Sequence, residues 1–270
     1  MAKITELDRN LCNEKIKSIV AITKGFLDNE KKTLLELKKN PADAAIRKLT
    51  LSDEMINLAS NYMAINGVSQ AVLKTKNENA LNDARKTLYK AVIYLEEIVT
   101  NYIDAPFSEY EKKLSAIESY DANQRYHLIR KIGLAIDLIK YWYGDNSKWR
   151  WTFVELEGRY SAVAKNIVDL RNAYTNSSPD SPYYESTVYH LRLIKKLIAQ
   201  SADRYREKYE LSTGQTHDFK TGINFLGALR RLHIVMGESE DAEDLKKKMT
   251  IWTNKYEADA KKQEEAKKRM

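Results

Sequence analysis

The sequence has few residues that interrupt helices. Among its 270 residues there are only 9 Gly and 4 Pro, well below the usual share in globular proteins. Because these two residues mark most turns, their scarcity predicts long helices joined by few loops. No segment shows the sustained polar–apolar alternation of a β-strand. These observations predict an all-α fold.

Cysteine and long apolar runs are also scarce. The single cysteine, Cys12, excludes an intrachain disulfide framework. The longest apolar runs, such as Ala91–Leu95, are too short to span a bilayer. Residues 1–6 lack the apolar core of a signal peptide. We therefore expect either a cytoplasmic protein or the processed, mature form of an exported one.

Motifs of known chemistry are missing as well. None of the four histidines stands in a His-Glu-x-x-His or Glu-x-x-His metal-binding pattern. The glycine-rich loops that bind phosphate and the nucleophile turn of hydrolases do not occur either. We predict no catalytic residue, no cofactor, no metal site and no enzymatic activity. An enzyme would need a constellation assembled from distant residues.

The strongest positive signal is an apolar heptad pattern. Between Trp149 and Tyr174 the apolar residues are spaced alternately four and three apart, which predicts one long helix packed at a shallow angle. Its stripe consists of Trp149, Phe153, Leu156, Tyr160, Val163, Ile167, Leu170 and Tyr174. Residues 128–143 repeat the pattern, and Gly144–Ser147 joins the two segments. We predict a helical hairpin over residues 121–174 as the centre of the molecule.

The remaining chain is interpreted in the same way. A helix is expected from Ile4 to Lys39, and its buried side is expected to carry Ile4, Leu7, Leu11, Ile19, Ile22, Phe26, Leu34 and Leu37. Asn40 and Pro41 are expected to start the next helix, and Gly67 to break it. Ser108 with Glu111, and Asp121 with Gln124, have the spacing of N-terminal capping boxes.

These patterns predict an elongated bundle of about eight or nine helices with coiled-coil-like packing. We divide it into an N-terminal sub-bundle, residues 1–120, and a C-terminal sub-bundle, residues 121–270, which contains the hairpin. A single domain is the alternative.

The charge pattern bears on the class of partner. The formal net charge is +7, from 45 basic and 38 acidic residues that are interspersed along the chain. Basic residues are concentrated near the hairpin bend, but acidic residues interrupt them and no nucleic-acid recognition motif accompanies them. We therefore expect no nucleic-acid partner and no membrane-spanning segment.

Aromatic residues are abundant at the same bend. The chain holds 17 Tyr, 4 Trp and 5 Phe, and Tyr141 and Trp151 lie off the apolar stripes. Lys148 and Arg150 are next to them in sequence. Tyrosine, tryptophan and arginine are typical of interface anchors. We predict that these four residues contact another protein, with packing on a third helix as the alternative.

The chain as a whole resembles the flagellar coiling proteins of the spirochaete periplasmic flagellum. The likeness lies in its helical character and abundant tyrosine, in the aromatic pair Tyr141–Tyr143 and Trp149–Trp151, and in the charged tail ending at residues 266–270. The resemblance implies a non-enzymatic filament-sheath component, located in the periplasm, that binds filament proteins and contributes to coiling and motility. It transfers no site residues.

A second hypothesis is a cytoplasmic helical adaptor or scaffold that mediates protein–protein interactions. Both hypotheses expect other proteins as partners, and self-association is compatible with either. An encoded signal peptide would separate them, because only the sheath component requires export.

Overall fold

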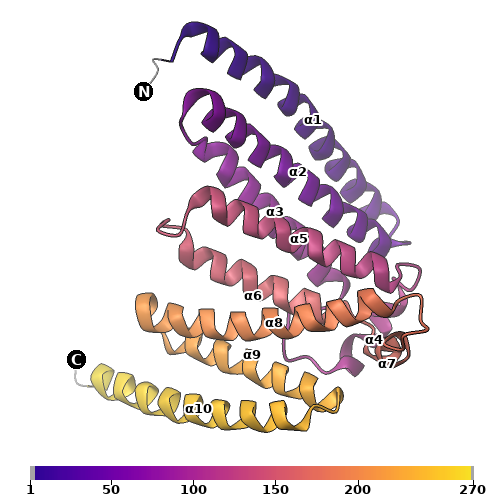
Figure 1. The fold of residues 1–270 in the computed structure, drawn as a ribbon, viewed down its shortest axis with the longest axis vertical. Coiled ribbons are helices and arrows are strands. Elements are labelled where there is room, and N and C mark those ends of the chain that lie inside the picture. The colour runs from indigo at the N-terminus through magenta and orange to yellow at the C-terminus, as the bar shows by residue number, and fades with distance from the viewer. Residues whose placement is uncertain (1–3, 269–270) are drawn as a thin grey trace. The chain divides into compact units, whose positions relative to one another are not determined.

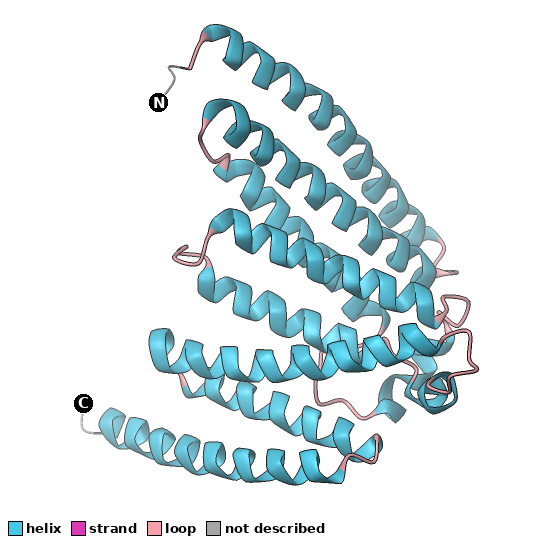
Figure 2. Ribbon diagram, viewed as in Figure 1, coloured by secondary structure: helices cyan, strands magenta, loops and turns pink. Residues whose placement is uncertain are grey.

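The described part of the chain, residues 4–268 of a computed structural model, is helical throughout its regular elements (Figure 2). It contains ten α-helices, one five-residue π-helical turn and no strand. The prediction of an all-α fold is confirmed, and the number of helices is slightly above the eight or nine expected. Among residues 4–268, no helix combines the length and apolar character needed to cross a bilayer.

The helices follow one another with short connections (Figure 1). Their bounds are α1 Glu6–Lys39, α2 Ala44–Leu73, α3 Glu78–Ile98, α4 Phe107–Ser115, α5 Ala122–Tyr143, α6 Arg150–Asn166, α7 Leu170–Asn176, α8 Tyr184–Lys208, the π-helical turn Tyr209–Thr213, α9 Thr216–Val235 and α10 Ser239–Lys268.

The chain divides into two units. The first comprises the chain up to Val99 together with Lys112–Ser147, and the second comprises Thr100–Glu111 together with the chain from Lys148 onward. This grouping differs from the expected boundary at residue 120, because α5 packs on α2 and α3 and so belongs with the helices before it. The two helices of the predicted hairpin, α5 and α6, therefore fall in different units.

In the first unit, α1 packs on α2, α2 on α3, and α5 on both α2 and α3. Aliphatic side chains from α2, α3 and α5 fill its core, among them Met55, Leu58, Leu88, Leu95 and Ile132. One buried charge connects α1 to α3. The Glu30 carboxylate accepts hydrogen bonds from Lys90 Nζ at 2.9 Å and from the Tyr94 hydroxyl at 2.6 Å, and these partners offset the cost of burying it.

In the second unit, α8 packs on α6 and α9, and α9 packs on α10. Small residues allow two of these close approaches. A Cβ on Gly222 would lie 2.9 Å from the backbone oxygen of Ala202, and a Cβ on Gly158 would lie 2.7 Å from the Tyr205 ring. Aromatic rings hold α10 in place, since Phe219 stacks on Tyr209 and also contacts Trp252.

The prediction of one helix from Trp149 to Tyr174 is wrong. α6 ends at Asn166, and α7 starts at Leu170 behind Asp169, whose side chain accepts hydrogen bonds from the backbone N–H groups of Arg171 and Asn172. The apolar stripe is buried as far as Ile167, whereas Tyr174 is 92% exposed. A new N-terminal cap therefore interrupts a heptad pattern that continues in the sequence.

Three further predictions of helix ends are wrong. Gly67 lies inside α2, which runs without a break to Leu73. Asn40 ends α1 instead of starting α2, which begins behind Asp43. Ser108 lies inside its helix, because α4 starts at Phe107. The capping box of Asp121 and Gln124 is confirmed, with both of its hydrogen bonds present.

The expected buried side of α1 is correct only in part. Ile4, Leu7, Leu11 and Ile22 are exposed, whereas Ile19, Phe26, Leu34 and Leu37 are half-buried on the side that carries the buried residues Cys12, Thr23 and Glu30. Apolar periodicity did not reveal that this side also buries the polar side chains of Thr23 and Glu30. The outer surface of α1 carries apolar side chains together with many lysines.

Candidate protein-binding surface

The four predicted interface residues are divided between the two units. Tyr141 lies near the end of α5 in the first unit, and Lys148, Arg150 and Trp151 lie at the start of α6 in the second. Each group is therefore described separately.

On α5, Tyr141 forms part of an exposed apolar stripe. Leu134, Leu138 and Tyr141 are 61%, 43% and 74% exposed. Their spacing of four and three residues places all three on one side of the helix. The opposite side of α5 carries the buried residues Ile129, Ile132 and Ile139. We call Leu134, Leu138 and Tyr141 the α5 face.

The neighbouring residue Trp142 packs against Tyr141 of the α5 face. The Tyr141 ring lies edge-on to the Trp142 ring, with the centroids 5.4 Å apart. Trp142 is half-buried, and its indole lies 3.8 Å from the position that a Cβ on Gly67 of α2 would occupy. Tyr141 is therefore held beside a packed side chain while most of its own surface stays open to solvent.

The remaining solvent side of α5 is sparsely charged. His127, Arg130 and Asp137 are exposed on it, and the half-buried Lys131, three residues before Leu134, pairs with Asp53 of α2. Apolar contact area bordered by polar groups, with a tyrosine hydroxyl available for hydrogen bonding, is the composition of a protein interface.

At the start of α6, the cationic side chains lie over the tryptophans. The Arg150 guanidinium carbon is 4.7 Å from the centroid of the Trp151 ring, and Lys148 Nζ is 5.5 Å from that of Trp149. Arg150 also lies 4.0 Å from Glu207 of α8. Trp151 is half-buried, so this residue contributes to packing as well as to the surface.

A buried lysine forms the most unusual polar site of the second unit. Lys165 Nζ donates to the backbone oxygen of Ala105 at 3.0 Å and to Asn166 Oδ1 at 3.1 Å. It lies over the Tyr110 ring, and burial lowers its pKa to about 8. The Asn166 amide in turn donates to the backbone oxygens of Thr100 and Tyr102. These contacts hold residues 100–111 against α6 and leave the amine closed to a substrate.

One group in the described residues has the ligand types of a metal site, namely His233, Glu238 and Asp241 at the turn between α9 and α10. His233 Nδ1 lies 2.6 Å from Glu238 Oε2, and Lys195 Nζ lies 2.6 Å from Glu238 Oε1. Burial would raise the pKa of Glu238, but Lys195 and then His233 outweigh it and hold the pKa below its usual value. Lys195 of α8 thus already forms an ion pair with this carboxylate, and we interpret the group as a polar cluster that connects the turn to α8.

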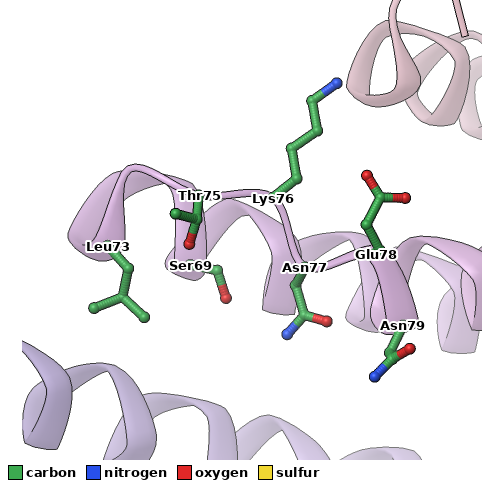
Figure 3. A pocket seen from close by; sticks show the side chains of 7 residues that line it. All are labelled: Ser69, Leu73, Thr75, Lys76, Asn77, Glu78 and Asn79. Carbon is green, nitrogen blue, oxygen red and sulfur yellow. The ribbon is translucent and has the colours of Figure 1, made fainter.

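A hollow of about 320 Å³ lies at the loop between α2 and α3 (Figure 3). Its lining is mainly short and polar, and Lys76 reaches away from it to donate to the backbone oxygen of Tyr143. The Asn77 side chain caps α3 through the N–H group of Ala80. Ligand pockets are mostly apolar with a few convergent polar groups, whereas most of the residues that line this hollow are polar.

Sequence reasoning selected Tyr141 but missed Leu134 and Leu138. The available signal was the excess of aliphatic residues in α5, which has too many for one buried stripe. It also missed Lys165, because nothing in the sequence distinguishes a buried lysine from the exposed lysines around it.

The chain belongs to the TP0443 family, whose sequence profile matches residues 8–260. No curated protein and no solved structure matches it.

Proposed function

We propose that this protein is a non-enzymatic structural protein that binds another protein through the α5 face. The observation that supports the proposal is the exposure of Leu134, Leu138 and Tyr141 along one side of a rigid helix. Exposure of apolar side chains to water is unfavourable in free energy, and burial against a partner surface would remove this exposure. A convex helix surface also suits a protein groove better than a small molecule, which binds in a concave site.

The narrower form of the proposal is a filament-sheath component that binds filament proteins in the periplasm and contributes to coiling and motility. It is supported by the resemblance of the sequence to flagellar coiling proteins. The cytoplasmic adaptor or scaffold is the second candidate. Helices stacked on one another in sequence order, as α1, α2 and α3 are (Figure 1), favour it, because such stacks present extended binding surfaces.

The test is a partner capture with matched surface variants. One variant carries Leu134→Ser and Tyr141→Ser, and the control carries Val235→Ser and Ile251→Ser, which are similarly exposed at 67% and 68% on α9 and α10. Each tagged protein is used to recover partners from cells that produce it naturally. The melting temperature of each variant is measured in parallel.

We expect the α5 variant to lose its specific partner while it melts close to the unchanged protein, and the control to retain the partner. Loss of a central anchor corresponds to roughly 2 kcal/mol or more of binding free energy. Equal capture by all three proteins would contradict the proposal. A filament protein as the partner would support the sheath role, and a cytoplasmic protein the adaptor role.

A further inference from the structure

The outer side of α1 carries a regular row of lysines. Lys17, Lys24, Lys31 and Lys38 are all exposed and follow one another at intervals of seven residues. Seven residues advance a helix by about 10.5 Å and return it to nearly the same side. The row therefore extends for roughly 32 Å along the helix. We call these four residues the lysine row.

Two apolar side chains lie within the row. Val20 is 48% exposed and stands between Lys17 and Lys24, and Leu35 is 58% exposed and stands between Lys31 and Lys38. The buried side of the helix packs on α2 and carries Cys12, Thr23 and Glu30. Lys24 and Lys31 directly follow Thr23 and Glu30, so the row lies about 100° around the helix from this buried side and forms a mixed cationic and apolar surface open to solvent.

Within residues 4–268 none of the four ammonium groups forms an ion pair, although Glu14 and Asp28 are exposed on the same helix. Glu30 is buried with Lys90 and Tyr94, and Glu36 pairs with Arg47 of α2 at 3.1 Å. Asp8 caps the start of α1. Asp28 is exposed beside the row but forms no ion pair with it.

Several lysines elsewhere in the chain form ion pairs. On α10, Lys246, Lys247, Lys255 and Lys268 pair with carboxylates three or four residues away on the same helix. Such pairs are the ordinary state of a solvated helix surface. In the described chain the four lysines of the row form no such pair, and neither do Lys15, Lys32 and Lys39 of the same helix, so the feature that distinguishes the row is its strict seven-residue register on one side of α1.

We propose that the lysine row docks an acidic helix of another protein, one whose carboxylates recur every seven residues. Two helices packed at a shallow angle share the same axial repeat of about 10.5 Å, so each lysine would meet one carboxylate while Val20 and Leu35 pack between them. A membrane surface requires no such register, and two aliphatic side chains offer little apolar area for insertion. This surface is distinct from the α5 face, so the inference goes beyond the proposed function.

The test uses two synthetic helical peptides of 28 residues and equal composition. In the first, Glu occupies every seventh position, and in the second the same Glu residues are scattered. Binding to the full-length protein is measured by fluorescence at several salt concentrations. Vesicles that contain phosphatidylglycerol serve as a separate probe.

The matched variants change three charges each on the same helix. The row variant is Lys17→Gln, Lys24→Gln and Lys31→Gln. The control is Lys15→Gln, Lys32→Gln and Lys39→Gln, whose lysines are equally exposed and point to other sides of α1. Glutamine has nearly the helix propensity of lysine, so both variants should keep α1 intact.

The unchanged protein should bind the heptad peptide at least tenfold more tightly than the scattered one, and salt should weaken this binding. The row variant should bind the heptad peptide at least tenfold more weakly than the unchanged protein. The affinity of the control for this peptide should fall by less than threefold. A row variant with glutamate in place of the three lysines should prefer a heptad peptide of lysine. Equal binding of both peptides, equal losses in the two variants, or tight vesicle binding that depends on the row would each overturn the proposal. None of these outcomes bears on the α5 face.

Discussion

Lys165 shows at the scale of one residue how a buried charge influences stability. The ammonium group has hydrogen-bond acceptors but no ion-pair partner in the described part of the chain, and burial lowers its pKa from 10.5 to about 8. Below pH 8 the folded protein bears the cost of this buried charge. Between about pH 8 and 10.5 the unfolded chain binds more protons here than the folded one, so the free energy of unfolding rises with pH in this window.

We predict that the contribution of Lys165 to this free energy rises by up to about 3 kcal/mol from pH 8 to pH 10.5, since a pKa lowered by one pH unit corresponds to about 1.36 kcal/mol. Denaturant melts of the unchanged protein and of Lys165→Met should be compared at pH 7, 8, 9 and 10. The difference between the two proteins should move in favour of lysine as the pH rises. Parallel pH profiles would show that the ammonium is not buried.

Glycines provide a second prediction at this scale. Gly222→Ala should destabilise the second unit by about 1–3 kcal/mol, because the new Cβ would lie 2.9 Å from the backbone oxygen of Ala202, which cannot rotate away. Gly25→Ala, in an exposed position of α1 with open space around it, should stabilise by about 0.5–1 kcal/mol. Thermal melts of both variants test this pair, and a stabilised Gly222→Ala would contradict the packing of α8 on α9.

At the scale of an element, the division between α6 and α7 separates residues of one sequence stripe. Leu156 is fully buried and Tyr174 is 92% exposed, although the heptad spacing treats them alike. Leu156→Ala should cost about 2–5 kcal/mol, and Tyr174→Ala less than about 0.5 kcal/mol. Similar losses of unfolding free energy for the two variants in urea melts would instead support a single long helix from Trp149 to Tyr174.

The elements also show how far sequence reasoning extends. The start of α5 was predicted correctly from local sequence, because the side chains of Asp121 and Gln124 each accept a hydrogen bond from the other residue's backbone N–H group. The all-helical class followed from the scarcity of glycine and proline. The end of α6 could not be predicted, since Lys165 and Asn166 bind a segment about 60 residues earlier in the chain. Distant contacts of this kind leave no periodic signal.

The same reason explains the errors elsewhere. Gly67 remains helical because α2 packs along its length on α3, so tertiary contact outweighs a local preference of about 1 kcal/mol. The buried side of α1 is fixed by Glu30, whose burial depends on Lys90 and Tyr94 of α3. Of the predicted interface, Tyr141 is 74% exposed on α5. The exposure of Leu134 and Leu138 beside it could be recognised only from the three-dimensional packing of α5.

At the scale of the whole molecule, the first unit presents two surfaces of different chemistry. The α5 face is apolar, and the lysine row of α1 is cationic and lacks ion-pair partners in the described chain. The two polar sites described above, around Lys165 and around Glu238, form hydrogen bonds and ion pairs that connect helices and loops of the second unit. These features together support a protein that works by binding other proteins.

The most direct test of this account is site-specific photocrosslinking in cells that produce the protein. A photoreactive phenylalanine analogue replaces Tyr141 on the α5 face in one strain and Lys86, an exposed position of α3, in another. We predict a discrete cross-linked product with one other protein from position 141 and none of that product from position 86. Identical patterns from both positions would contradict the central claim, and a product containing only a second copy of this chain would replace it with self-association.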